Sequence, residues 1–83
     1  MKRLRVERER RGWSRAELAR RARLNAVTVG LIEAGRLVPY PSQLRKLAGA
    51  LGLGVEDADQ LSSDVMDAAL SGQAVDGQGR GRV

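Results

Sequence analysis

The chain has 83 residues and a net charge of +5, with 15 Lys and Arg against 10 Asp and Glu. Cys and His are both absent from the sequence, which excludes disulfides and thiolate metal sites and removes the commonest general base and metal ligand. No apolar run approaches the ~20 residues needed to span a bilayer, and the first residues lack the apolar stretch of a signal peptide. We therefore expect one small, soluble, cytoplasmic domain without a membrane span.

The charge is unevenly distributed along the chain. Residues 1–54 hold 13 Lys and Arg against 4 Asp and Glu, a net of +9, whereas residues 55–83 hold 2 against 6, a net of −4. A basic N-terminal part favours binding to a polyanion such as nucleic acid, with ordinary solvated charge as the alternative.

Helical spacing begins with the first residues, and no alternating run of β-branched residues predicts a strand. The first predicted helix, 2–11, is highly charged and has only Leu4 and Val6 as apolar anchors. The second opens at "WSRAELARRA", where Ser14 suits the N-cap and Glu17 completes a capping box. The sequence therefore predicts an all-α fold.

The third and fourth predicted helices are bounded by residues that favour helix ends. Asn25 is a good N-cap, and Gly35 suits the left-handed end of a helix that closes just before it. The linker "RLVPYP" follows, and Pro41 suits the first turn of the next helix. That helix, "SQLRKLAGAL" at 42–51, places its Leu residues at helical spacing.

The C-terminal part is first acidic and then rich in glycine. An acidic helix is predicted over 56–70, with apolar residues along one side. The stretch "GQAVDGQGRGRV" has four Gly and little to bury, so we expect 72–83 to be a disordered tail. The predicted domain is then a compact unit of five helices over 1–71.

Small and apolar residues between the second and third predicted helices have the spacing of two crossed helices. Ala19 supplies a small residue where the backbones touch, and Leu24, Val29 and Ile32 pack the third helix on the second. Together with "RGWSRAELARRA", "VGLIEAGR" and "PYPSQLRKLAGALGL", this pattern resembles the lambda-repressor-like helix-turn-helix family of the Cro and phage-repressor type, over about residues 4 to 54.

The resemblance implies five short helices and a sequence-specific regulator of transcription, a repressor by type. The third helix would lie in the major groove of double-stranded DNA, and a homodimer would bind a palindromic operator. Base-facing positions implied by the family pattern are Asn25, Ala26, Val27, Thr28 and Leu31. Phosphate contacts are implied for Arg15, Arg36, Ser42 and Gln43, partly through N–H groups at helix starts.

The resemblance also implies an internal ion pair between Arg8 and Glu33, with a solvated Arg8 as the alternative. Two residues depart from the family pattern. Arg23 stands where the turn usually has Gly, so we expect it to adopt a left-handed conformation at a cost of ~1 kcal/mol. Arg15 replaces the usual Gln at the start of the second helix, which favours a charged phosphate contact over a neutral one.

The predicted reading helix is unusually apolar. Ala26, Val27 and Leu31 can pack on thymine methyl groups, and Thr28 can add a hydrogen bond. They cannot make the bidentate base pairing worth ~1–3 kcal/mol, so affinity would depend on arginines and phosphates, and specificity on methyl contacts and DNA shape. The alternative is a protein-binding adaptor or antitoxin that uses the same apolar face to bind a protein partner.

The acidic helix allows two interpretations. Its apolar side either packs within the chain or forms the seam of a homodimer, which would join half-sites ~34 Å apart. The residues predicted for the dimer interface are Leu61, Val65, Met66 and Ala69. In the tail, Arg80 and Arg82 are expected to be solvated, with a minor-groove arm as the alternative.

Enzyme chemistry is not expected. Four acidic residues of the predicted acidic helix have no His nearby: Asp57, Asp59, Asp64 and Asp67. The "GQGRG" stretch follows no strand and lacks the Gly-Lys-Ser/Thr ending of a phosphate-binding loop. The acidic residues also lack the twelve-residue pattern of a calcium loop. We therefore expect no catalytic site, no metal and no organic cofactor.

Overall fold

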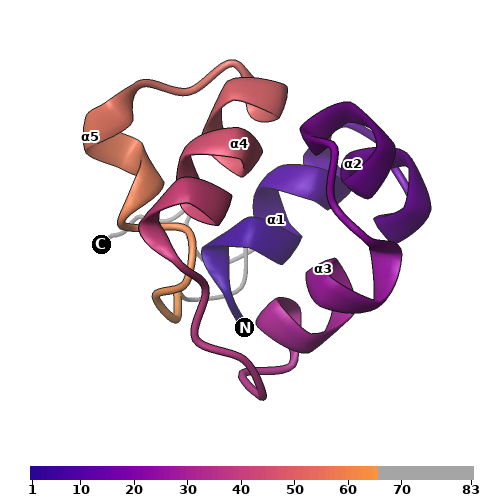
Figure 1. Cartoon of the computed structure of the whole chain (residues 1–83), viewed down its shortest axis with the longest axis horizontal. Coiled ribbons are helices and arrows are strands. Elements are labelled where there is room, and N and C mark those ends of the chain that lie inside the picture. Colours follow the sequence, from indigo (N-terminus) through magenta and orange to yellow (C-terminus); the bar gives the residue numbers. More distant parts are fainter. Residues whose placement is uncertain (66–83) are drawn as a thin grey trace, which may run out of the picture.

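Five helices make up residues 1–65, the part of the chain that the computed structural model describes (Figure 1). They are α1 (Arg3–Arg10), α2 (Arg15–Ala22), α3 (Ala26–Glu33), α4 (Pro41–Leu51) and α5 (Val55–Ala58). No strand forms within these residues, so the predicted all-α fold of five helices is confirmed. None of the five is both long enough and apolar enough to traverse a lipid bilayer. The predicted boundary at 71 and the tail after it lie outside the described residues.

Helices α2 and α3 begin at the residues that the sequence predicts. Ser14 caps α2 by accepting the N–H of Glu17 at 3.0 Å, and Asn25 caps α3 by accepting the N–H of Val27 at 2.8 Å. The capping box predicted for α2 is only half made, because the Glu17 carboxylate binds Arg20 and Arg21 on the next turn instead. Two charged hydrogen-bond donors at i+3 and i+4 stabilise the Glu17 carboxylate more than a single backbone N–H would.

Helices α1 to α4 all end in the same way, with a residue of positive φ after the last turn. Glycine takes this position in three of them: Gly12, Gly35 and Gly52 have φ of 70°, 74° and 73°. After α4, for example, the N–H of Leu53 donates back to the carbonyl of Ala48 at 2.8 Å. These bonds are those of a Schellman motif, which satisfies carbonyls that the helix leaves free.

The core takes one large apolar side chain from each part of the fold. Leu4, Leu18, Ile32, Leu47 and Leu61 are all at most 1 % exposed. Helix α2 packs against both α3 and α4, and α4 packs against α5, so these side chains meet in a single cluster. Each fully buried Leu or Ile contributes roughly 1.5–3 kcal/mol of hydrophobic free energy. The core therefore holds α3 by its inner face and leaves its outer face free.

The fifth helix is much shorter than predicted. The sequence predicts a helix over 56–70, but α5 ends at Ala58 and the next five residues form turns. Ser62 and Ser63 favour turns because their hydroxyls compete for backbone groups. Leu61 lies within these turns and is fully buried in the core beside Ala58. The rest of the predicted helix, 66–70, lies outside the described residues.

These turns cap the N-terminus of α1. Lys2 occupies the N-cap position but makes no side-chain cap. The N–H groups of Arg3 and Leu4 donate instead to the carbonyls of Ser63 and Leu61, both at 2.9 Å. The first N–H groups of α1, which have no acceptor within the helix, thus bind carbonyls about sixty residues away. This is why the acidic segment forms turns after Ala58 although its sequence has helical spacing.

The prediction of a dimer contact is wrong for Leu61. This side chain is fully buried within its own chain, so the intramolecular alternative holds for it. Val65 is half-buried, and its N–H donates to the carbonyl of Met1 at 2.8 Å. The other two predicted dimer residues, Met66 and Ala69, lie outside the described residues.

A buried carboxylate ties α1 to two other helices. Glu7 accepts hydrogen bonds from Arg3 at 3.2 Å and from Arg11 at 3.0 Å. Arg3 also binds Asp57 of α5 at 3.3 Å, and Arg11 donates to the carbonyl of Leu51 at the end of α4 at 2.7 Å. Burial disfavours the charge on Glu7, but the two arginines outweigh it and hold the pKa of this carboxyl below its ordinary value of 4.5.

Truncating Leu61 tests the position of the turn segment. Leu61→Ala should lower the free energy of unfolding by about 2–5 kcal/mol, because it opens a cavity in the core. Urea denaturation of the full chain measures the change. Val55→Ala on α5 is the control, since Val55 is 74 % exposed, and should shift it by no more than about 0.5 kcal/mol. A loss that grew as the chain was diluted would instead place Leu61 in a dimer contact.

Neutralising Glu7 tests the carboxylate that joins the helices. At neutral pH, Glu7→Gln should be less stable than the unaltered chain. A folded-state pKa below 4.5 adds stability that is present above pH 4.5 and is lost as the pH falls through the folded-state value. The difference between the two chains, measured by urea denaturation at a series of pH values, should therefore disappear in acid. Glu56→Gln, which removes an exposed carboxylate, should show no such difference at any pH; a gap for Glu7→Gln that persisted in acid would contradict the assignment.

Candidate functional site

Helices α2 and α3 are joined by a turn of three residues. Arg23 takes the left-handed conformation predicted for it, with φ 58° and ψ 44°. The N–H of Leu24 donates to the carbonyl of Ala19 at 2.8 Å, the same bond that closes the turns after the other helices. Ala19 is 2 % exposed, which fits the small residue predicted where α2 meets α3. The pair is thus a helix-turn-helix with its corner closed by backbone bonds.

The predicted ion pair between Arg8 and Glu33 is confirmed. Arg8 donates from Nε to Oε2 of Glu33 at 2.7 Å and from Nη2 to Oε1 at 3.0 Å, and its Nη1 reaches the carbonyl of Trp13 at 2.7 Å. Hydrogen bonding to Glu33 raises the pKa of the Arg8 guanidinium, although burial opposes this. The bidentate pair fixes the end of α3 against α1.

Arg15 has a partner that the sequence analysis does not predict. Its Nε donates to Oε1 of Glu33 at 3.2 Å, so one carboxylate joins α1, α2 and α3. The Arg15 side chain crosses α3 at Gly30, where an added Cβ would lie 3.6 Å from Cδ of Arg15. The sequence carries no signal for this contact, because an Arg in place of the family's Gln does not point to Glu33, and alanine would also fit at Gly30.

The outer face of α3 is apolar. Val27 is 67 % exposed and Leu31 is 37 % exposed, and with Gly30 and Ala34 they form one strip at helical spacing. We call these four residues the α3 strip. The other residues predicted to face bases lie at its edge: Thr28 is half-buried, Ala26 packs partly on the core, and Asn25 is exposed but uses its side-chain oxygen as the cap.

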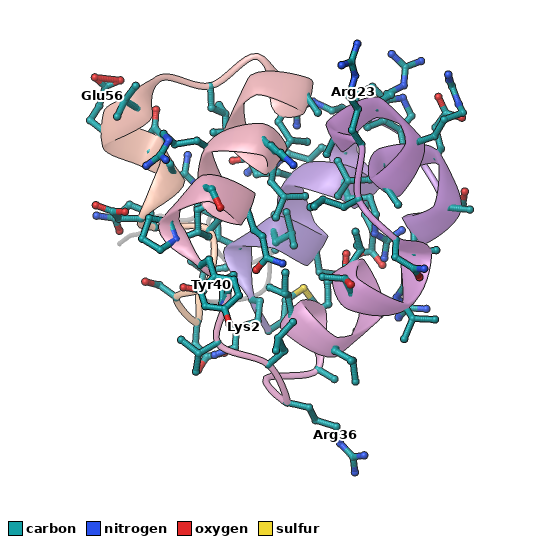
Figure 2. The ribbon with its side chains drawn as sticks, viewed as in Figure 1. Lys2, Arg23, Arg36, Tyr40 and Glu56 are labelled. Carbon is teal, nitrogen blue, oxygen red and sulfur yellow. The ribbon has the colours of Figure 1, made fainter. Side chains whose placement is uncertain are left out.

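The residues predicted to contact phosphates differ in their exposure and in whether their side chains have partners within the chain. Arg36 follows α3 and projects away from the body of the molecule (Figure 2), with no ion-pair partner among residues 1–65. Ser42 is exposed in the first turn of α4. Gln43 is half-buried, and its side-chain oxygen accepts the N–H of Tyr40 at 2.8 Å. Gln43 therefore caps α4, which leaves only its amide nitrogen to donate outward.

The corner between α1 and α2 is stiffened by an aromatic contact that the sequence analysis does not predict. The guanidinium of Arg21 lies over the Trp13 ring, 4.2 Å from its centroid, and that of Arg11 lies 5.9 Å away. Cation–π contacts of this kind contribute about 0.5–2 kcal/mol. Since Arg8 also binds the Trp13 carbonyl, this corner sets where α2 begins relative to α1.

Comparison with known protein families gives a match over most of the chain. A family model described as a helix-turn-helix domain matches residues 2–61, which include all five helices. No curated protein and no solved structure matches the chain.

Replacing Arg23 tests the turn of the motif. Arg23→Gly should raise the free energy of unfolding by up to about 1 kcal/mol, because glycine adopts the left-handed conformation without the steric penalty of a side chain. Urea denaturation measures the gain. Arg45→Gly, on the exposed side of α4, should lower the same quantity by about 1 kcal/mol. A loss of stability for Arg23→Gly would mean that the Arg23 side chain stabilises the turn.

Proposed function

We propose that this chain represses transcription by occupying an operator through α3. The chain belongs to the helix-turn-helix domain family and is thereby a DNA-binding regulator. In this proposal α3 enters the major groove, as the second helix of such motifs does, and two copies of the chain bind the two halves of a palindromic site. Occupancy of the operator is the whole mechanism, and no chemical step is required of the protein.

The observation that carries the proposal is the exposed α3 strip with exposed cations beside it. Val27 is two-thirds exposed on a helix whose opposite side is buried, and Arg36 lies three residues after the end of that helix (Figure 2). A duplex presents base edges to such a strip and phosphates to such arginines. The side chain of Val27 is small enough for the helix to approach the groove closely.

The chemistry of the α3 strip assigns specificity to the base contacts and affinity to the phosphate contacts. Its side chains offer no hydrogen-bond donors, so they discriminate bases by packing on the methyl group of thymine. The arginines supply affinity that does not depend on sequence and that weakens as salt rises. We propose Arg15, Arg36, Ser42 and the amide nitrogen of Gln43 as the phosphate contacts.

The homodimer is part of the same proposal. A palindromic operator needs two copies with their α3 helices ~34 Å apart. With Leu61 excluded by its burial, the proposed contact consists of Val65, Met66 and Ala69. Of these, Val65 is half-buried beside Met1, at the point where the described residues end.

A protein partner is the second candidate function. The same strip, with Val27 and Leu31 exposed, favours it because interface centres are poor in charge and rich in apolar area. An adaptor or antitoxin would cover the strip with a complementary apolar surface. DNA is the stronger candidate since the family is one of DNA-binding domains and residues 1–54 carry a net charge of +9.

Selection of bound fragments from random duplex DNA at about 150 mM salt tests the proposal. The unaltered chain should enrich a palindromic site, and Val27→Ala should weaken the preference for thymine at the contacted position several-fold, since each buried CH₂ contributes about 0.8 kcal/mol. Val55→Ala is the matched control, because Val55 is a similarly exposed valine on α5. Arg36→Ala should weaken binding to all sequences alike and reduce the slope of log affinity against log salt by about 0.9.

Two results would contradict this function. No enrichment of any sequence by the unaltered chain would remove operator binding. Unchanged DNA binding by Val27→Ala and Leu31→Ala, together with loss of a protein that otherwise co-purifies, would assign the α3 strip to a protein partner.

A further inference from the structure

Two arginines share the Glu33 carboxylate, and they hold it in different ways. Arg8 binds both oxygens and is buried with Glu33: their side chains are 9 % and 2 % exposed. Arg15 adds one bond, from Nε to Oε1 at 3.2 Å, and its side chain is 53 % exposed. The carboxylate is therefore already satisfied by Arg8, and Arg15 is an additional partner at the surface.

The charges of this cluster do not balance. Arg8 and Arg15 share the Glu33 carboxylate. The other carboxylate near Arg8, that of Glu9 at 3.8 Å, is itself paired with Arg5 at 3.0 Å, so three guanidinium groups and two carboxylates leave one positive charge in surplus. Because Arg8 and Glu33 are both buried, the surplus charge lies at the exposed end of Arg15. An exposed cation of this kind attracts an anion from solution more strongly than one whose charge is matched by a carboxylate of its own.

The geometry also directs this cation. The stem of Arg15 passes across Gly30 of α3, and the guanidinium is anchored at Nε. Its two Nη groups have no hydrogen-bond partner in residues 1–65, so the flat end with four N–H donors remains available. Such a fork binds two oxygens of one phosphate when its plane is held in place, since less side-chain entropy is lost on binding.

We propose that Glu33 is a positioning residue for phosphate binding: it holds Arg15 by Nε so that the Nη fork meets a backbone phosphate beside the α3 strip. The inference rests on the proposed DNA-binding function and names a role within it. Gly30 belongs to the arrangement because a side chain larger than alanine would displace the stem of Arg15. Arg8 keeps its structural role and holds Glu33 in place.

The anchoring is tested first without DNA. Hydrogen exchange at the arginine Nε–H groups, followed by NMR on the full chain, should be slower for Arg15 than for Arg36, which lacks a carboxylate partner in the described residues. Equal exchange rates at the two groups would overturn the proposal without bearing on DNA binding.

The second test separates charge from orientation. Arg15→Lys keeps the positive charge but has a single ammonium, which cannot bind Glu33 and chelate a phosphate at once. It should weaken binding to every duplex about five- to tenfold and leave the salt slope unchanged, whereas Arg15→Ala should also reduce the slope by about 0.9. Arg20→Lys is the matched control, since Arg20 shares Glu17 with Arg21 on the same helix, and it should bind DNA like the unaltered chain.

Glu33→Gln completes a cycle with Arg15→Lys. A positioning role predicts that Glu33→Gln weakens DNA binding several-fold when Arg15 is present and adds nothing when Lys is present. An equal loss in both backgrounds would show a purely structural role and overturn the proposal. If Glu33→Gln does not fold, the comparison of Arg15→Lys with the unaltered chain decides, and full affinity in Arg15→Lys overturns it. Failure of the unaltered chain to bind any duplex would instead refute the proposed function.

Discussion

The Glu33 carboxylate is the acceptor around which the helix-turn-helix is arranged. Burial of a lone carboxylate costs several kcal/mol, so the fold is stable only where donors surround it. Arg8 reaches it from α1 and Arg15 from α2, while Glu33 itself ends α3. A bidentate pair tolerates little rotation or sliding, which makes the position of α3 a consequence of electrostatics as well as of packing.

Many of the arginines are bound to partners within the chain. Arg3, Arg8 and Arg11 bind carboxylates or helix-end carbonyls within the chain, and Arg20 and Arg21 are paired with Glu17. A high count of arginines therefore overstates the charge available to a polyanion. Those whose charge faces outward, such as Arg15 and Arg36, adjoin the helix that carries the α3 strip.

The parts of this fold that the sequence predicts are local in origin. The caps at Ser14 and Asn25, and the left-handed ends at glycine, are decided within a few residues, so their spacing predicts four helices well. The length of α5 depends on donors of α1 about sixty residues away, and no periodicity within 56–70 reveals them. The bond from Arg15 to Glu33 is likewise tertiary: Gly30 gives it room, but a glycine does not say which side chain crosses it.

The residues around the apolar α3 strip affect how it can contact a duplex. Gly30 lowers the stability of α3 by roughly 1 kcal/mol relative to alanine, yet it lies under the side chain of Arg15. The α3 strip thus lies next to the Arg15 guanidinium, whose position is fixed. If a duplex occupies this face, the phosphate at Arg15 and the bases at Val27 belong to one rigid unit, so the register of the backbone contact determines which base pairs the strip can meet. The apolar side chains of the strip distinguish bases only weakly, but they can then discriminate sequences. A duplex site bound out of register loses phosphate contacts together with methyl contacts.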